Sequence, residues 1–192
     1  MPRGMVIFLG CLFGCAVGEN ASLAPVVLVP GLAGSVFEAK LTNAEAPHFW
    51  CAKTTKDYFV TWLNLAQLVP EQKDCLLSRL ALAYNDTTET FANAKGVEIN
   101  SNVDFGGVGG VAYVDPSLKK AMPYFAKMID NLTASGYEIG KNLHGAGYDW
   151  RLGPLGHQQT ERPGGFFRKL KSLVENTTEV NGKKSVVVTH SL

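Results

Sequence analysis

The apolar residues of the chain form short unbroken runs separated by longer stretches with helical spacing. The runs at residues 25–29 (PVVLV) and 185–189 (SVVVT) are rich in β-branched side chains, which is the pattern of buried strands. Residues 143–151 resemble another strand that leads into a loop. Residues 30–35 (PGLAGS) follow the first run and are predicted to form a glycine-punctuated loop.

Three stretches are predicted to be helices. In residues 58–69 apolar and aromatic side chains recur every three or four positions, and Pro70 is expected to end this helix. Residues 116–135 show helical spacing over a longer stretch, with Gly136 as the C-terminal stop. Residues 166–175 carry the third apolar stripe.

Residues 85–116 are expected to be irregular. The glycine cluster at residues 106–110 (GGVGG) fits turns and tight strand connections, or equally a flexible loop. It lacks a preceding apolar strand and a helix start, so we do not expect a nucleotide loop. The order strand, excursion, helix, strand, helix, strand predicts an α/β fold with a mostly parallel sheet and helices on both faces.

The N-terminus has the pattern of a secretory signal peptide. One basic residue, Arg3, precedes an almost unbroken apolar run at residues 5–17, and small residues follow at Ala16 and Gly18. The alternative is a membrane anchor, but a spanning helix needs about 20 apolar residues. We therefore predict a signal peptide at residues 1–18, which leaves residues 19–192 as part of one domain.

Composition and charge favour a globular secreted protein. Hydrophobic residues make up 46% of the chain, enough for a core. Loss of Arg3 would leave 18 − 1 = 17 basic residues against 17 acidic ones, so nothing electrostatic points to nucleic acid. Outside the signal peptide the cysteines are Cys51 and Cys75, expected to form one disulfide, with two unrelated buried thiols as the alternative. Zinc-type cysteine spacings are absent from the sequence, and we expect neither a metal nor a cofactor.

Four Asn-X-Ser/Thr sequons mark candidate glycosylation sites in a secreted chain. Asn85, Asn131 and Asn176 are predicted to be glycosylated, whereas Asn20 is discounted because it lies close to the cleavage site.

The last apolar run leads into Thr-His-Ser-Leu at residues 189–192. A nucleophilic serine is commonly placed in a sharp turn after a strand, where the next backbone N–H helps to bind the oxyanion. Taken alone this signal is weak, because Thr189 occupies a position where glycine is usual. The loop at residues 30–35 strengthens it, since an oxyanion hole needs a second N–H from an early loop. The alternative for that loop is an ordinary strand-ending turn.

Several motifs, in order along the chain, resemble the lecithin:cholesterol acyltransferase and lysosomal phospholipase A family. The stretch VVLVPGLAGSVFEAKL resembles the start of that family, and its further motifs follow in sequence order. These are WC at 50–51, YFVTWLNL at 58–65, DC at 74–75, YNDT at 84–87, VDP at 114–116, GAGYDWR at 145–151 and HSL at 190–192. The chain departs from the family at residues 103–106 (VDFG), Gly147 and Leu76.

The resemblance implies an α/β-hydrolase fold and a role for several residues. Ser191 would be the nucleophile, and the backbone N–H groups of Leu32 and Leu192 would form the oxyanion hole. Cys51 and Cys75 would close a membrane-binding segment at residues 51–75. Its lipid contacts are predicted to be Tyr58, Phe59, Trp62 and Leu63, with a buried core helix as the alternative.

The order of the family's catalytic triad places its Asp and His after the serine, so the resemblance implies that the domain is incomplete at its C-terminus. Asp149 and Arg151 are therefore interpreted as a structural ion pair. His190 is adjacent to Ser191 and is not expected to act as its base.

The expected function is serine-dependent acyl transfer from glycerophospholipid esters, as a phospholipase or as an O-acyltransferase to a sterol or other lipid alcohol. The expected partners are phospholipid and a membrane or lipoprotein surface. The expected location is the secretory pathway, ending outside the cell or in the lysosome. The alternative is a truncated, catalytically inactive lipid-binding fragment that lacks the triad Asp and His.

Overall fold

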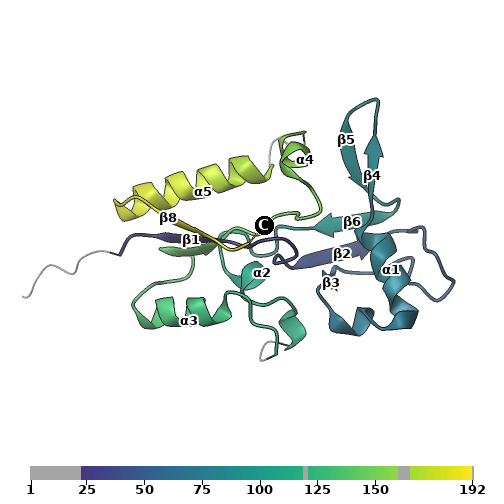
Figure 1. Cartoon of the computed structure of the whole chain (residues 1–192), viewed down its shortest axis with the longest axis horizontal. Coiled ribbons are helices and arrows are strands. Elements are labelled where there is room, and N and C mark those ends of the chain that lie inside the picture. The colour runs from purple at the N-terminus through teal and green to yellow at the C-terminus, as the bar shows by residue number, and fades with distance from the viewer. Residues whose placement is uncertain (1–22, 119–120, 160–164, 192) are drawn as a thin grey trace, which may run out of the picture.

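The computed structural model describes residues 23–118, 121–159 and 165–191 (Figure 1). The predicted signal peptide at residues 1–18, the sequon at Asn20 and the predicted oxyanion residue Leu192 lie outside the described residues.

A three-stranded parallel sheet lies at the centre of the molecule. Its strands β1 (Val26–Val29), β7 (Leu143–Gly145) and β8 (Val186–Thr189) run in the order β7-β1-β8. All three predicted strands are confirmed. In the register of β1 and β8, Val29 is paired with Thr189, so the carboxyl ends of the two strands lie side by side.

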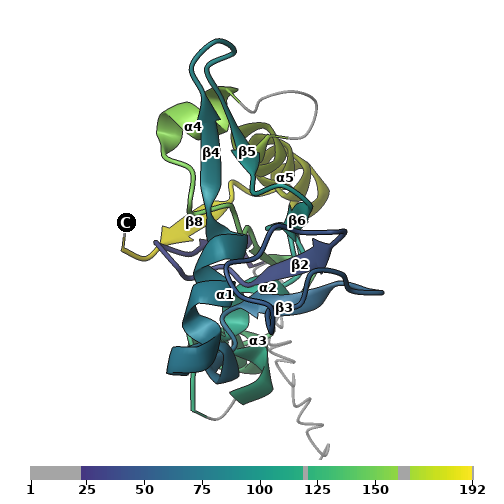
Figure 2. The same cartoon turned by 90° about the vertical axis from the view of Figure 1, so that its right-hand side faces the viewer.

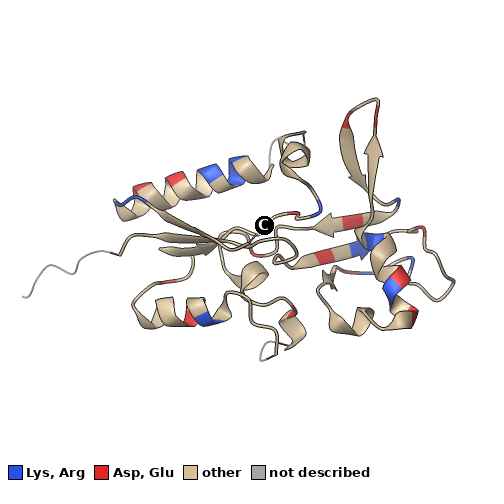
Figure 3. Ribbon diagram, in the orientation of Figure 1, with Lys and Arg blue, Asp and Glu red and all other residues tan. Residues whose placement is uncertain are grey.

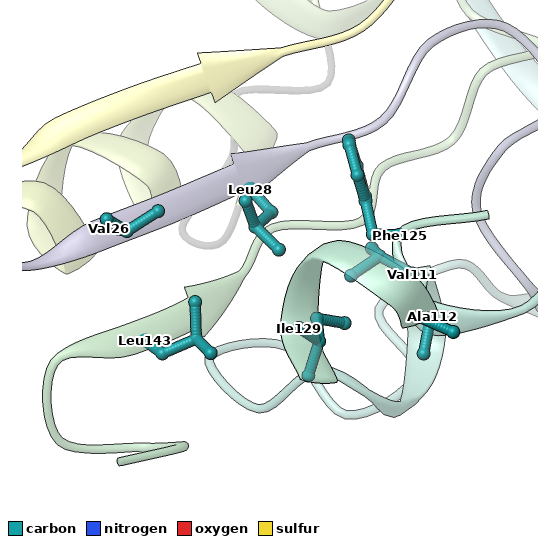
Figure 4. Packing of buried hydrophobic residues seen from close by; sticks show 8 residues of the cluster. Val26, Leu28, Val111, Ala112, Phe125, Ile129 and Leu143 are labelled. Atoms are coloured by element: carbon teal, nitrogen blue, oxygen red, sulfur yellow. The ribbon is translucent and has the colours of Figure 1, made fainter. Parts of the chain in front are cut away.

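Helices cover both faces of this sheet (Figure 1). Successive residues of a strand point to opposite faces. Val26 and Leu28 pack with Leu143, Phe125 and Ile129 on the side of helix α3 (Ala126–Ala134), as Figure 4 shows.

Val27 and Val29 pack on the other side. Their neighbours there include four apolar residues of helix α5 (Phe166–Asn181), namely Phe166, Leu170, Leu173 and Val174. Because β1 is apolar on both faces, it is stable only between two helical layers.

Helix α5 (Phe166–Asn181) confirms the predicted helix at residues 166–175 and continues past it. It ends at Gly182, which has a φ of 63° in the left-handed region that glycine adopts without strain.

The predicted helix at residues 116–135 is wrong over its first half. Pro116–Leu118 is a short 3-10 turn, and α3 begins only at Ala126 and ends at Ala134. Pro123 explains the difference, because proline has no N–H to donate and its ring clashes with the preceding helical turn. Pro123 instead forms an isolated bridge with Tyr113.

The predicted helix at residues 58–69 is also wrong. Phe59–Trp62 is strand β3, Leu65–Gln67 is a 3-10 turn, and helix α1 spans Pro70–Leu80. Pro70 therefore begins a helix, since its fixed φ suits the first helical position, where no N–H is required. The alternation of Phe, Val, Thr and Trp suits a strand, and β3 pairs with β2 (Phe37–Leu41).

A second sheet is antiparallel, with the order β3-β2-β6, where β6 spans Val97–Asn100. A separate hairpin of β4 (Leu82–Asn85) and β5 (Thr90–Asn93) extends away from the rest of the molecule (Figure 1 and Figure 2). Strands β5 and β6 lie within residues 85–116, the region that was expected to be irregular. The architecture is thus a mixed one of helices and sheets, with a parallel central sheet and antiparallel pairing in the other two sheets that the described residues form. Two short helices, α2 (Gly109–Ala112) and α4 (Pro154–Gln159), complete it.

Cys51 and Cys75 form a disulfide with a Cα–Cα distance of 5.5 Å. It joins the loop before β3 to helix α1, and both cysteines are buried. The disulfide-closed segment at residues 51–75 therefore contains β3 and the start of α1.

Charge is distributed without a marked bias. Figure 3 shows residues of both signs on α1, α3 and α5. In the described part of the chain, every helix is too short or too polar to cross a membrane.

Candidate active site

Ser191 lies just after β8, in a turn with left-handed backbone geometry. Its φ is 60°, which is uncommon for a residue other than glycine. A sharp, strained turn after a strand is the geometry that exposes a serine hydroxyl at the carboxyl edge of a sheet. Because β8 is paired with β1, the turn starts beside the loop that follows β1.

Gly31 brings that loop into direct contact with the serine turn. A Cβ at position 31 would lie 2.4 Å from the carbonyl oxygen of His190 and 2.9 Å from the Cβ of Ser191. Both distances are shorter than atoms tolerate, so this approach of the two backbones requires glycine. The glycine loop at residues 30–35 and the serine turn are therefore packed neighbours.

Indole groups from two distant segments fix the far end of the glycine loop. Trp62 Nε1 donates a hydrogen bond to the Ala33 carbonyl at 2.9 Å, and Trp150 Nε1 donates to the Ser35 carbonyl at 3.3 Å. The hydroxyl of Ser35 accepts a hydrogen bond from the Tyr148 N–H at 3.0 Å. The loop is thus held by β3 and by the segment after β7, which limits its motion near Ser191.

A cleft of about 480 Å³ opens beside the serine turn. Most of its lining is apolar or aromatic. The lining residues are Val29, Pro30, Leu32, Tyr148, Trp150, Leu152, Gly153, Pro154, His157, Phe166, Phe167, Thr189 and Ser191. Leu32 and Ser191 border the same cleft, and Leu32 is exposed at its rim.

Asp149 and Arg151 form the ion pair that the sequence suggested, with Arg151 Nη2 2.6 Å from Asp149 Oδ2. Arg151 also donates hydrogen bonds to the Leu80 carbonyl and to Asn93 Oδ1. Both charged side chains are largely buried, with 6% of Arg151 and 15% of Asp149 exposed. The pair therefore connects the segment at residues 148–152, which contributes lining residues to the cleft, to α1 and β5.

His157 is a cleft residue that the sequence did not reveal. It lies on α4, is 5% exposed and packs among the rings of Tyr148, Phe166 and Phe167. Burial lowers the pKa of its imidazole, and the nearby Asp149 only partly opposes this. No motif surrounds this residue in the sequence, so no local signal could have identified it.

His190, expected not to act as the serine base, points toward Tyr124, and its Nδ1 lies 2.8 Å from the Tyr124 hydroxyl. This contact was also missed, because residues 124 and 190 are far apart in the chain.

The four predicted lipid-contact residues do not share one surface. Tyr58 is exposed and Phe59 is partly buried. Trp62 points inward to Ala33, and Leu63 is buried. Other apolar residues in or just before the segment are also exposed, namely Phe49, Trp50, Leu68 and Val69.

The three sequons at Asn85, Asn131 and Asn176 are exposed. The Asn85 side chain accepts hydrogen bonds from the N–H groups of Thr87 and Thr88 at the tip of the β4–β5 hairpin. Within residues 23–118, 121–159 and 165–191, no three His, Cys, Asp or Glu side chains gather as a metal would need.

Comparison with known proteins identifies the family. The family model for lecithin:cholesterol acyltransferase matches residues 58–192. A lysosomal phospholipase A and acyltransferase of Bos taurus is 37% identical over 99% of this chain, which covers 46% of that relative. A phosphatidylcholine-sterol acyltransferase of Homo sapiens is 36% identical over 100% of this chain, which covers 42% of that relative. This chain therefore spans less than half the length of these relatives, and its matches place it in the lecithin:cholesterol acyltransferase family.

Proposed function

We propose that Ser191 is the nucleophile of a lipid acyl enzyme that cleaves an acyl ester of a glycerophospholipid. The observation that supports this most strongly is the contact between the serine turn and Gly31, which puts both segments at the mouth of one apolar cleft. Water, a sterol or another lipid alcohol would accept the acyl group.

The proposed chemistry begins with attack of Ser191 Oγ on the ester carbonyl carbon. Negative charge then develops on the carbonyl oxygen, where the backbone N–H groups of Leu32 and Leu192 would stabilise it. The carbonyl re-forms as the alcohol leaves, giving an acyl-serine and a lysophospholipid. The acceptor then attacks the acyl-serine and restores the serine hydroxyl.

A histidine oriented by an acid would take the serine proton and pass it to the leaving alcohol. The family order places both residues after Ser191, so we propose that they lie in sequence beyond residue 192. Asp149 is committed to Arg151 and does not supply the acid.

The cleft suits an acyl chain. Its walls carry Trp150, Phe166 and Phe167, and its volume is about 480 Å³. An apolar wall that surrounds a polar reacting group also excludes water and strengthens the hydrogen bonds to the oxyanion.

We further propose that the whole domain is an α/β-hydrolase and that the protein enters the secretory pathway to act outside the cell or in the lysosome. The parallel sheet with helices on both faces and the disulfide support this.

N-terminal sequencing of the secreted protein should give a sequence that begins after Gly18, and an intact N-terminus would contradict the signal peptide. The same material should carry glycans at Asn85, Asn131 and Asn176.

We propose that the disulfide-closed segment at residues 51–75 contacts the lipid surface, together with the residues just before it. The exposed apolar side chains of Phe49, Trp50, Leu68 and Val69 support this more strongly than the buried Leu63 does. Tyr58 and Phe59 would contribute from the side of β3. Replacing Phe49 with Ser should weaken sedimentation with phosphatidylcholine vesicles, and unchanged sedimentation would argue against this surface.

The function is tested with the natural protein, including any sequence after residue 192, on phosphatidylcholine vesicles that contain cholesterol. Free fatty acid and cholesteryl ester are both measured, because their ratio reports the acceptor. Ser191→Ala should reduce both products by at least about 1,000-fold. A variant that retains wild-type turnover would refute the assignment of Ser191.

Residues 1–192 alone should release no fatty acid in a serine-dependent manner, as an inactive lipid-binding fragment would behave. Activity of this fragment that Ser191→Ala abolishes would overturn the placement of the triad Asp and His after residue 192.

A further inference from the structure

On the basis of the proposed function, we infer that Tyr124 is a positioning residue whose hydroxyl holds the glycine loop against the serine turn. It lies between two segments that the chemistry must keep together, namely the loop at residues 30–35 and the turn at His190 and Ser191.

The Tyr124 hydroxyl contacts both segments at hydrogen-bonding distance. The N–H of Gly31 donates to it at 3.0 Å, and Nδ1 of His190 lies 2.8 Å away. A neutral imidazole with its proton on Nε2 accepts the hydroxyl proton at Nδ1, and an imidazole protonated at Nδ1 donates instead. The bridge therefore exists in either protonation state, and a phenyl ring could not replace it.

Tyr124 is itself rigidly placed. Its backbone N–H donates to the Ala112 carbonyl at 2.9 Å, and its ring packs edge-on against Phe125 at a centroid distance of 4.9 Å. The ring also packs closely against the loop at Gly34. A Cβ at that position would lie only 2.7 Å from Tyr124 Cζ, so no other side chain fits there. A fixed residue that touches two points of the loop can set its position relative to Ser191.

The position of this loop decides where the N–H of Leu32 points. Leu32 follows Gly31 directly, so a shift of the Gly31 peptide changes the direction of the proposed oxyanion donor. Such a donor acts on charge that develops in the transition state and binds the ground-state ester little. Loss of the hydroxyl should therefore lower kcat and leave KM nearly unchanged.

The test compares Tyr124→Phe with Tyr137→Phe in the natural protein. Tyr137 packs against the same apolar cluster, and its hydroxyl makes no hydrogen bond within the described residues. The first measurement is hydrogen–deuterium exchange of the peptide that contains Gly31 and Gly34. The second is kcat and KM for a soluble p-nitrophenyl ester, with Ser191→Ala as the reference for serine-dependent turnover.

We expect Tyr124→Phe to speed exchange in the glycine loop and to lower kcat by about tenfold, the size of one lost hydrogen bond near a developing charge. Tyr137→Phe should change neither. Replacing His190 with Ala in the Tyr124→Phe background should add little, because both changes break one bridge.

Unchanged exchange in Tyr124→Phe would overturn the inference, and so would faster exchange with an unchanged kcat. If Ser191→Ala retained wild-type turnover, the proposed function would fail. The exchange measurement would still decide whether Tyr124 holds the loop.

Discussion

At the scale of single residues, the contact at Gly31 is the most constraining feature of the site. Gly31→Ala should lower turnover by at least about 100-fold, because the new methyl group would push the serine turn away from the glycine loop. Steady-state kinetics of the natural protein checks this. Gly147→Ala is the control, since its Cβ would meet Ser35 Oγ at an ordinary distance of 3.4 Å. Equal activity of the two variants would contradict the close approach at Gly31.

Replacing each of two buried threonines with valine tests how much a hydrogen bond from a buried hydroxyl contributes to stability. The hydroxyl of Thr61 is buried without a hydrogen-bond partner among the described residues, whereas that of Thr177 contacts His144 Nε2 at 3.0 Å. Thr61→Val should raise the free energy of unfolding by about 1 kcal/mol, and Thr177→Val should lower it by a similar amount. Thermal unfolding checks both signs, with shifts of about 3 °C expected. A destabilised Thr61→Val would show that its hydroxyl has a partner.

At the level of helices and strands, the sequence predicted the central sheet well and the region between β1 and β7 poorly. Runs such as 25–29 are apolar at every position, and a strand buried on both faces is the structure that this pattern permits. The stripe at residues 58–69 satisfied helical spacing, but its strand-forming residues pair with β2, and a pairing partner is not visible in local spacing. Pro123 was a local signal that could have shortened the helix at residues 116–135.

The candidate site was predictable to a similar extent. Ser191 and the loop at residues 30–35 could be proposed because each follows a recognisable strand, and the family resemblance then singled out Leu32. Tyr124 and His157 could not, since their places beside the glycine loop and the cleft arise only when distant segments pack together.

Asp115 connects two 3-10 turns, one at Leu65–Gln67 and the other at Pro116–Leu118. We expect its contribution to the free energy of unfolding to depend on pH. Its carboxylate accepts hydrogen bonds from the N–H groups of Leu65 and Ser117 and from the Ser117 hydroxyl. Burial by itself raises the pKa of Asp115, but these hydrogen bonds outweigh it and the pKa is lowered.

A lowered pKa means that the unfolded chain binds the proton more readily, so the stabilisation is present above the unfolded pKa of about 3.9 and is lost as pH falls through the folded pKa. Asp115→Asn should therefore cost about 2 kcal/mol at pH 7, and its difference from the wild type should shrink below about pH 4. Denaturant unfolding at several pH values measures this. A difference that does not vary with pH would rule out the ionised carboxylate as the cause.

At the scale of the whole molecule, the disulfide-closed segment supports the site from outside the central sheet. Trp62 lies within this segment and donates a hydrogen bond to the glycine loop at Ala33. We therefore expect the conformation of the disulfide-closed segment to be coupled to that of the glycine loop beside the cleft.

Replacing Cys51 and Cys75 with Ala should lower the free energy of unfolding by about 3 kcal/mol, since the crosslink restricts the unfolded chain. Hydrogen exchange should become faster in β3 and in the glycine loop, and remain slow in β1. Faster exchange in β3 alone would mean that the disulfide-closed segment and the glycine loop are not coupled.

We propose that Ser191 presents a nucleophilic hydroxyl to an apolar cleft beside the glycine loop. Reaction of the natural protein with a long-chain alkyl fluorophosphonate, followed by peptide mass spectrometry, tests it most directly. We predict one phosphonate adduct, on Ser191, formed much faster with a long alkyl chain than with a short one. An adduct on another serine, or no adduct on the folded protein, would show that Ser191 is not the nucleophile.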